Sequence, residues 1–565
     1  MPAPRTNPRL HLALIPLAAL VAVLPLILHG CSCGHDFDFH ILSWMEAGQQ
    51  LLHGHMPQWA DTPAWNAGEP RFVFYPPLSW LIGALLGLLL PWKFAPIAYT
   101  WLALTASGLA LHRLARVYAG PTAATLAAIL YLANPYMLFT AYERTAYAEL
   151  LAAAWMPLLL QAILAEEVTA PAIALPVALL WLTNAPAGVM GCYALAFLGA
   201  IRLAQTPAGR RLKLAANGCG GLMLGLCSIA FYLLPAAAEQ KYVQVAMAVI
   251  PGMRIADNTL FHITGDGPHD DVLHTASVIA VILLAAAILS LAFSWLAPKV
   301  RHPERSEGSP YLFFARSNPA FALGALTGTI ALLLTPIALP VWQHAPKLAF
   351  LQFPWRILAI LAAVFGLAAA KALNPLRLKP LSLTAVALAG AAALILPAYR
   401  NFAQPCDPAD TVEARLALFH SPAGTDPTDE YTPAPADNDS LKHADPPYWL
   451  LPPQAAYAQP VQTAPGPAPR QLTLNLPQPE TLVLNLRAYP SWRVTRNGQI
   501  FPARVERADG LLALPLPAGP SSILVKEAKP WQMPDRAVGD AISVVSLALF
   551  ALYRGRRPAA SRAVA

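Results

Sequence analysis

Apolar runs of about 17 to 25 residues recur along the chain, and their length is what most constrains its fold. An α-helix needs about 20 apolar residues to cross the hydrocarbon core of a bilayer. The runs lack the alternation of apolar and polar residues that is typical of membrane β-strands. Because 56% of the 565 residues are hydrophobic and only 12% are charged, the chain has too little polar surface to cover a water-soluble globule of this size. The sequence therefore predicts an α-helical polytopic membrane protein.

Basic residues cluster at the ends of these runs, and they predict the orientation of the chain. Cytoplasmic loops are enriched in Lys and Arg. Five clusters mark that face: Arg113 and Arg116; Arg202, Arg210, Arg211 and Lys213; Lys299, Arg301, Arg305 and Arg316; Lys371, Arg377 and Lys379; and Arg554, Arg556 and Arg557. The net charge of +7 follows from this clustering, so it does not indicate a nucleic-acid partner.

The apolar run at 75–92 decides how many spans agree with these clusters. As a full span it would place Arg113 on the outer side, and it is short and opens with Pro76-Pro77. We therefore expect a half-inserted helix on the outer face and a first outer loop at 31–95. About twelve spans then remain, with both termini inside.

The chain changes character after the apolar run that ends near residue 396. Pro, Asp and Thr become frequent, an Asn-Gly hairpin turn stands at 497–498, and strand-like alternation of period two appears at 471–476, 481–486 and 522–525. The stretch at 400–468 is expected to be irregular loop. We expect a polytopic membrane domain at 1–397, an extracytoplasmic loop and small β-sandwich domain at 398–535, and a final transmembrane helix with a cytoplasmic tail at 536–565.

Two carboxylates, Asp36 and Asp38, lie just past the first apolar run. Such a group can deprotonate an acceptor hydroxyl or hold a divalent cation, and the alternative is a helix cap with a solvated charge. Both acids would lie at the N-terminal end of a helix, where the helix dipole stabilises negative charge. The spacing predicts that this helix is amphipathic and lies along the membrane surface, with a polar face formed by His40, Ser43, Glu46, Gln50 and His53.

Further ionisable residues gather on the same expected face. Arg144 and Arg356 stand at helix ends, where a guanidinium forks to a phosphate at headgroup depth or simply snorkels to the interface. Glu69 and Arg71 precede a rigid turn at Tyr75, which would aim them at the loop helix. The alternative that we favour for them is ion pairing on a wet surface.

Neither a disulfide framework nor a zinc site is predicted. The six cysteines form no CxxC pair and have no histidine at metal-ligand spacing: Cys31, Cys33, Cys192, Cys219, Cys227 and Cys406. The stretch at 266–274 is expected to be a solvated loop, with cation binding as the alternative. No cofactor is predicted with certainty, and a divalent cation is the one candidate.

Several segments together resemble a bacterial family. They are GHDFDFH at 34–40, GEPRFVFYPPL at 68–78, YER at 142–144 with Glu149, FYLLPAAAEQKYV at 231–243 and QFPWR at 352–356. These segments resemble membrane proteins labelled 6-pyruvoyl-tetrahydropterin synthase-related, which are similar to type C (GT-C fold) glycosyltransferases. The stretch YPSWRV at 489–494 is similar to the outer β-domain of such proteins.

The resemblance implies a function and a set of site residues. It implies sugar transfer from a polyprenyl-phosphate-linked donor to an envelope glycan or lipid acceptor, at the outer face of the bacterial plasma (inner) membrane and in contact with membrane lipids. Asp36 is the implied catalytic residue, with Asp38 close behind. The implied substrate-binding residues are His40, Glu69, Arg71, Tyr75, Arg144, Glu149 and Arg356.

Two other classes of function compete with this enzyme. One is a non-enzymatic envelope scaffold whose β-domain binds partners, and only the resemblance separates it from the enzyme. The other is a transporter of lipids or polysaccharides. Its expected signs are buried ionisable residues within the spans and a repeat with paired broken helices, and the sequence predicts neither.

Overall fold

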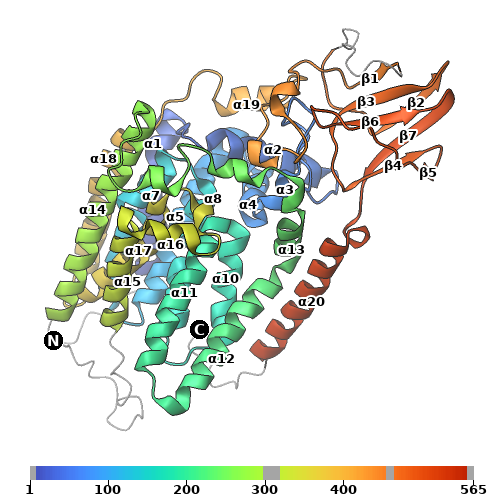
Figure 1. Cartoon of the computed structure of the whole chain (residues 1–565). Helices are drawn as coiled ribbons and strands as arrows, with labels where there is room; N and C mark the ends of the chain where they lie inside the picture. The colour runs from blue at the N-terminus through green and yellow to red at the C-terminus, as the bar shows by residue number, and fades with distance from the viewer. Residues whose placement is uncertain (1–7, 297–318, 453–463, 556–565) are drawn as a thin grey trace.

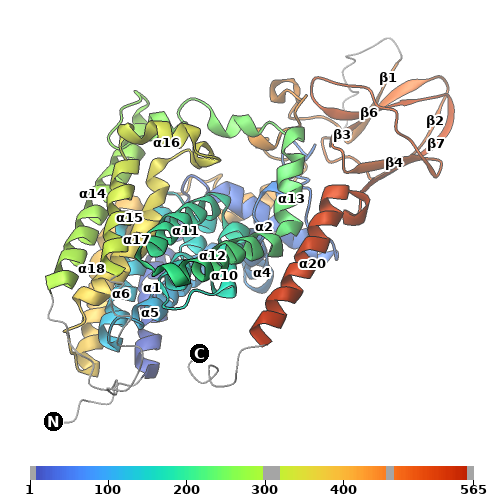
Figure 2. The ribbon, with the colours of Figure 1, turned by 60° about the horizontal axis from the view of Figure 1, so that its bottom comes forward.

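The structure, a computed structural model, describes residues 8–296, 319–452 and 464–555. Helices form one large bundle, and two small β-sheets lie beyond one end of it (Figure 1). The last long helix, α20 (Pro534–Gly555), returns from the sheets along the side of the bundle, as Figure 2 shows from below. A mostly helical protein with a small antiparallel sheet domain is therefore confirmed.

The described residues contain eight helical segments that are long and apolar enough to cross a membrane: Pro8–His29 (α1), Trp92–Ala115 (η1, Trp92–Phe94, and α5, Ala95–Ala115), Tyr147–Leu164 (α8, Tyr147–Ala152, and α9, Met156–Leu164), Ala185–Gln205 (α11), Gly267–Trp295 (within α14, Gly267–Leu296), Pro354–Ala372 (η8, Pro354–Ile357, and α17, Leu358–Ala372), Pro380–Phe402 (α18) and Pro534–Tyr553 (within α20). Three bent pairs raise the number to eleven: α6 (Pro121–Leu132) with α7 (Pro135–Tyr142), α12 (Ala208–Ser228) with α13 (Ala230–Glu239), and α15 (Pro319–Leu333) with α16 (Leu339–His344). The predicted count of about twelve stays a prediction.

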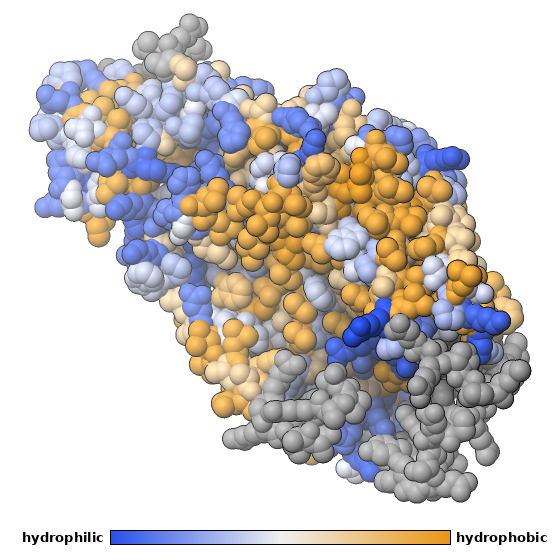
Figure 3. Space-filling view, turned by 180° about the vertical axis from the view of Figure 1, so that it is seen from behind, coloured by the Kyte–Doolittle hydropathy of each residue, from blue (hydrophilic) through white to orange (hydrophobic). Residues whose placement is uncertain are grey.

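Large apolar side chains cover much of the outer surface of the bundle. Figure 3 shows a broad hydrophobic region on one face, between the polar sheet domain and the opposite end. Exposed leucines of α1 and exposed residues of α14 and α18 contribute to the apolar surface: Leu17, Leu20, Leu24, Val281, Ile282, Leu289, Val386 and Leu394. Burying such side chains in lipid is favourable, which agrees with a multi-pass membrane protein.

Helix α4 (Pro77–Leu89) is the apolar run predicted to be half-inserted. Its 13 residues extend for about 20 Å at the rise of an α-helix, less than the roughly 30 Å of hydrocarbon. The helix begins after the extended Pro76 and ends at the extended Leu90, so neither end continues as helix. Its length agrees with the half-inserted reading. A second short apolar helix is α10 (Ala170–Thr183).

Histidines buried within two spans correct one step of the sequence argument. His11 of α1 and His112 of α5 are buried, and His11 Nδ1 lies 2.9 Å from Thr125 Oγ1 of α6. The expectation that the spans hold no buried ionisable residue is therefore wrong. Three bent helix pairs also occur, and broken helices are one of the expected signs of a transporter. The structure therefore weakens the sequence-based argument against a transporter.

The sheet domain consists of two antiparallel sheets. The first has the order β1-β3-β6: β1 (Tyr448–Leu451), β3 (Glu480–Arg487) and β6 (Leu511–Leu516). The second has the order β2-β7-β4-β5: β2 (Gln471–Leu476), β7 (Gly519–Glu527), β4 (Trp492–Arg496) and β5 (Gln499–Ile500). Alternate residues of β3, such as Leu482 and Leu484, pack against Ile523 and Val525 of β7 in one core. The three predicted strands and the packing of two sheets are confirmed.

The hairpin turn was also predicted correctly. Asn497 and Gly498 both have positive φ, 49° and 81°, which Asn and Gly tolerate better than other residues. Thr495 pairs with Ile500 across the turn, so the hairpin joins β4 to β5.

The stretch predicted to be irregular contains a helix and a disulfide. Helix α19 (Val412–Phe419) packs against α2 (Phe37–Leu52) of the first outer loop. Cys33 and Cys406 form a disulfide across 373 residues of sequence, so the expectation of no disulfide is wrong. No local spacing marks such a pair, because only the fold brings the two thiols together. The disulfide fixes the start of the loop to the segment after α18.

Candidate active site

Most of the polar face of α2 is buried rather than laid along the membrane surface as predicted, although Gln50 is half-buried and His53 is exposed. His40, Ser43 and Glu46 are all buried, because segments of the first outer loop cover this face. Tyr75 OH lies 3.3 Å from His40 Nδ1, and Thr62 N donates a 2.6 Å hydrogen bond to Glu46. The helix itself was predicted correctly, but its polar stripe contacts protein.

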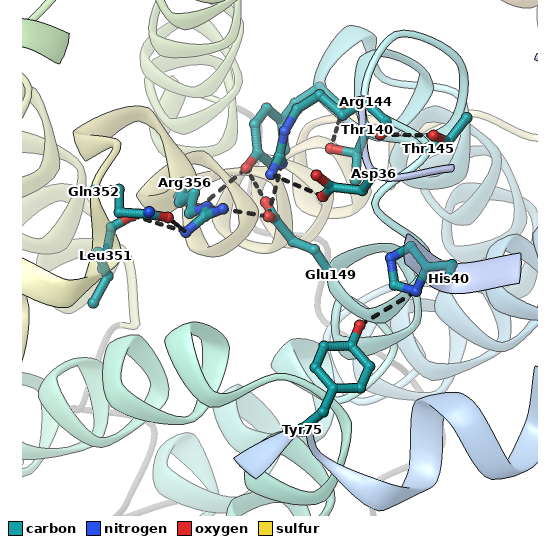
Figure 4. A network of polar contacts seen from close by, with 11 residues as sticks. Asp36, His40, Tyr75, Thr140, Arg144, Thr145, Glu149, Leu351, Gln352 and Arg356 are labelled. Atoms are coloured by element: carbon teal, nitrogen blue, oxygen red, sulfur yellow. Dashed lines mark hydrogen bonds and ion pairs between the residues drawn. The ribbon is translucent and has the colours of Figure 1, made fainter. Parts of the chain in front are cut away.

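Asp36 occupies the N-cap position of α2 without acting as a cap. Its carboxylate forms no cap hydrogen bond within the described part of the chain. Its backbone N–H donates to the Arg144 carbonyl at 2.9 Å, and its Oδ2 lies 4.0 Å from Arg144 Nη2 (Figure 4). The side chain is 44% exposed. Asp36 is therefore accessible and lies beside a guanidinium.

Asp38, the second predicted acid, is held by a different partner. Arg415 of α19 donates a hydrogen bond to Asp38 Oδ2 and a second to Asp410 at 2.5 Å. Burial raises the pKa of Asp38, and the positive charge of Arg415 opposes that effect. This pair joins α2 to α19. Asp38 is therefore hydrogen-bonded to its arginine, whereas Asp36 lies 4.0 Å from Arg144 without a hydrogen bond to it.

Arg144, Glu149 and Arg356 form a cluster next to Asp36. Arg144 Nη1 donates to Glu149 Oε2 at 2.7 Å, and Arg356 Nε lies 3.5 Å from the same oxygen. Tyr136 of α7 donates to the other oxygen, Oε1. Glu149 is only 3% exposed, and Figure 4 shows the two guanidinium groups converging on it. The structure thus brings four of the predicted residues, Asp36, Arg144, Glu149 and Arg356, together from three separate segments of the chain.

Aromatic rings fix the planes of both arginines. The Arg144 guanidinium carbon lies 4.8 Å from the Trp355 ring centre, and that of Arg356 lies 5.0 Å from the ring of Phe353. Arg356 Nη1 donates to the Leu351 carbonyl at 2.9 Å, whereas its Nε is buried without a hydrogen bond among the described residues. Because this Nε is the nitrogen 3.5 Å from Glu149 Oε2, charge rather than a hydrogen bond holds Arg356 to that carboxylate.

His40 and Tyr75 adjoin the cluster, and Figure 4 shows them across from Glu149. The His40 ring packs edge-to-face on Tyr147, with centres 5.2 Å apart. Burial lowers the pKa of His40 to about 4, so the ring is neutral near pH 7. A neutral imidazole offers one donor and one acceptor to a sugar hydroxyl.

Glu69 and Arg71 form a buried pair, so the expectation of a wet surface is wrong. Arg71 Nε donates to Glu69 at 2.8 Å, and its terminal nitrogens donate to Ser43 at 2.9 Å and Thr428 at 3.1 Å. All three guanidinium nitrogens are thereby engaged. The pair ties the first outer loop to the segment before the sheets, and no interaction joins it to Glu149 or Asp36 in the described chain. Their substrate contacts stay a prediction.

Two residues of the cluster, Tyr136 and Trp355, were not predicted from the sequence. Tyr136 carries no signal in the sequence, because its bond to Glu149 depends on the bend between α6 and α7. Trp355 stands in the QFPWR segment beside Arg356, but the stacking of Arg144 on it joins residues over 200 positions apart in the sequence.

The described residues hold no group of three or more His, Cys, Asp and Glu side chains placed to bind a metal ion. Asp36 and Asp38 each face an arginine, so they do not form a two-carboxylate cation site. The stretch at 266–274 was expected to be a solvated loop, but from Gly267 on it is the start of α14, where Asp270 accepts hydrogen bonds from the backbone of Thr264 and Gly265. These side chains do not fit a resident divalent cation.

No protein-family model matches the chain, and no curated protein matches its sequence. Among solved structures, arabinofuranosyltransferase AftD from Mycobacteria is similar at 18% identity and a TM-score of 0.42, over 71% of this chain and 27% of that one. The oligosaccharyltransferase AglB from Archaeoglobus fulgidus, solved with an inhibitory peptide and a dolichol-phosphate, is similar at 17% identity and a TM-score of 0.35, over 70% of this chain and 56% of that one. The chain thus spans less than two thirds of either protein. Because both TM-scores are below 0.5, the chemistry has to be argued from the site's own residues.

Proposed function

We propose that the protein is a membrane glycosyltransferase that transfers a sugar from a polyprenyl-phosphate-linked donor to an envelope glycan or lipid acceptor. The observation that carries the proposal is an accessible carboxylate, Asp36, beside the ring-stacked guanidinium of Arg144, which shares Glu149 with the ring-stacked guanidinium of Arg356. Glycosyl transfer from a lipid phosphate needs a base for the acceptor and positive charge for the leaving group. An envelope scaffold needs neither.

In the proposed reaction, Asp36 takes the proton of an acceptor hydroxyl. The acceptor oxygen then forms a bond to the anomeric carbon of the donor sugar, and the bond from that carbon to the phosphate oxygen breaks. The electron pair leaves with the polyprenyl phosphate, whose negative charge Arg144 and Arg356 stabilise. Glu149 holds the two guanidiniums together, so the phosphate meets them at fixed positions.

Charge balance supports this assignment of roles. The two arginines carry two positive charges against the single negative charge of Glu149. Asp36 balances the remainder from 4.0 Å, a distance beyond a hydrogen bond. A donor phosphate would take that place at Arg144 and leave Asp36 free to act as the base.

The proposed location is the outer face of the bacterial plasma membrane, with the sheet domain outside. The basic clusters support this orientation. The Cys33–Cys406 disulfide supports it as well, because disulfides persist in oxidising compartments. On this proposal 1–397, 398–535 and 536–565 are the membrane domain, the outer domain and the final span with its tail.

The test measures sugar transfer from labelled polyprenyl-phosphate donors in membranes that contain wild type, Asp36→Asn or Asp426→Asn. Asparagine keeps the shape of aspartate and removes the base, so the Asp36 variant should lose roughly 100-fold or more of the activity. Asp426 is an exposed acid outside the cluster, and its variant is the matched control with full activity expected. Undiminished transfer by Asp36→Asn would exclude it as the base. No transfer by wild type from any donor would favour the scaffold.

A further inference from the structure

A polar cavity of about 390 Å³ lies away from the Asp36 cluster, between the C-terminal half of α2 and the start of the sheet domain. Residues from the first outer loop, from the end of α19 and from the segment that leads into β2 surround it. Clefts at such junctions are common ligand sites. The lining includes Glu46, Gln49, His53, Asp61, Phe419 and Arg470.

Glu46 presents an unused acceptor to this cavity. The residue is only 3% exposed, and both of its hydrogen bonds, from Thr62 N and Thr62 Oγ1, end on Oε1. No described residue donates a hydrogen bond to Oε2. Because Glu46 lines the cavity, this oxygen is free to accept a hydrogen bond from a ligand or water there.

Asp61 and Arg470 form another part of the lining. Arg470 Nη2 donates to Asp61 Oδ1 at 2.6 Å, and the guanidinium carbon lies 4.5 Å from the Trp492 ring centre. Arg470 Nη1 is buried without a partner within the described ranges. The cavity therefore holds an unused donor as well as an unused acceptor.

The charge of the lining favours a neutral ligand. Burial, and then the charge of Asp61, raises the pKa of Glu46 to about 7. With Arg470 facing Asp61, the lining carries little net charge near pH 7. The two carboxylates disfavour an anionic ligand, and the described residues contain no cluster of three metal ligands. Uncharged hydroxyl groups, which both donate and accept, match these partners best.

We propose that this cavity binds a neutral saccharide through Glu46, Gln49, Asp61 and Arg470, with Phe419 beside the sugar ring. The inference rests on the proposed function, because the saccharide in this cavity would be a part of the acceptor glycan remote from the hydroxyl that reacts. Glu46 follows Asp36 by ten residues of α2, about 15 Å along the helix axis. A chain of several sugars covers that distance.

The test measures binding of neutral tetrasaccharides of glucose, mannose, galactose and arabinose to the purified full-length protein by saturation-transfer NMR. At least one should bind to wild type. Gln49→Ala removes an exposed amide from the lining and should weaken that binding about fivefold, the usual effect of losing a hydrogen bond. The matched control is Gln499→Ala in β5, which removes an exposed amide far from the cavity in sequence and should leave binding unchanged.

A second variant protects the test against misfolding. With binding measured above about pH 7, where Glu46 is ionised, Glu46→Gln keeps the acceptor for Thr62, replaces the second carboxylate oxygen by an amide donor and should weaken saccharide binding, while thermal unfolding stays cooperative. Absence of binding for all four tetrasaccharides, or equal binding by wild type and both cavity variants, would overturn the inference.

Binding without donor also separates this inference from the proposed function. Wild type and Asp36→Asn should bind the same tetrasaccharide with equal affinity, because Asp36 lies outside the cavity. Binding in the absence of any transfer would support the saccharide site while the enzyme proposal fails. Sugar transfer by wild type, with an acceptor KM that is the same in Gln49→Ala, would support the enzyme proposal while the saccharide site fails.

Discussion

Arg415 of α19 holds Asp38 of α2 in an ion pair, across 377 positions of sequence. The same guanidinium contacts Asp410, so one arginine joins the loop helix to the segment that follows α18. This pairing separates the roles of the two acids in the first outer loop. On the proposed mechanism Asp38 positions the loop, and Asp36 is the acid that meets the substrate.

Asp38→Asn is expected to lower transfer by less than about tenfold, because it weakens docking and leaves the base in place. Arg415→Gln should reproduce that loss, since it breaks the same pair from the other side. The measurement is transfer in membranes, normalised to protein amount. A loss as large as that of Asp36→Asn, seen for Asp38→Asn but not for Arg415→Gln, would move the catalytic role to Asp38.

The Cys33–Cys406 disulfide predicts how many cysteines react with a thiol reagent. In denatured, unreduced protein, maleimide-polyethylene glycol should add four times, at Cys31, Cys192, Cys219 and Cys227. After reduction it should add six times, and Cys33→Ser should give five additions with or without reduction. The gel shift of the modified protein reads this number. Six additions without reduction would show that the two thiols are not joined.

Opposite ends of α5 should face opposite sides of the membrane. The helix has 21 residues, about 31 Å, which matches the hydrocarbon thickness. In a variant without native cysteines, Lys93→Cys should react with an impermeant maleimide added to intact cells. Arg113→Cys should react only after the membrane is opened. Labelling of Lys93→Cys only in opened cells would make α4 a full span.

Sequence periodicity predicted the elements of the fold well, because burial imposes its own repeat. Strand β3 shows this, since its leucines at every second position form the core of the sheet domain. Helix α2 was predicted for the same reason. The surroundings of α2 were not predicted. A helix whose polar stripe faces water and one whose polar stripe faces polar protein groups have the same sequence pattern. Ser43 contacts Arg71, and nothing local in the sequence indicates that.

The candidate site was predicted in part. Asp36, Arg144, Glu149 and Arg356 were selected by residue type, position and resemblance, and they do lie together. The contacts that organise them were not predictable, because they join distant segments: Trp355 under Arg144, and Cys33 to Cys406. Arg71 was misplaced on a wet surface because a short-range Glu-Arg pair reads the same whether exposed or buried.

A buried ion pair anchors the last helix to the rest of the bundle. Arg536 of α20 donates to Glu239 of α13 at 2.7 and 3.0 Å, and Tyr489 OH adds a 2.8 Å bond to the same carboxylate. Arg536→Met leaves Glu239 buried and unpaired, which should cost about 3–5 kcal/mol. Arg536→Met with Glu239→Gln should recover part of this, since position 239 then carries no unpaired charge and only the half-buried Glu527 loses its contact with Arg536. Thermal unfolding in detergent measures the stability of the single and the double variant. An equal loss of stability in the two would argue against the ion pair.

Glu46 should make the stability of the protein depend on pH. Burial raises its pKa in the folded state from an ordinary 4.5 to about 7, so the folded protein keeps a proton that the unfolded chain releases. Stability from this group is therefore complete below about pH 4.5 and is lost as the pH rises to about 7. Glu46→Gln mimics the protonated acid, so its Tm should equal that of wild type in acid and exceed it above pH 7. Glu506→Gln, which removes an exposed carboxylate, is the control and should leave the pH profile unchanged. A wild-type Tm that rises from about pH 4.5 to about 7, with Glu46→Gln lower throughout, would mean that Glu46 is ionised and paired in the folded protein.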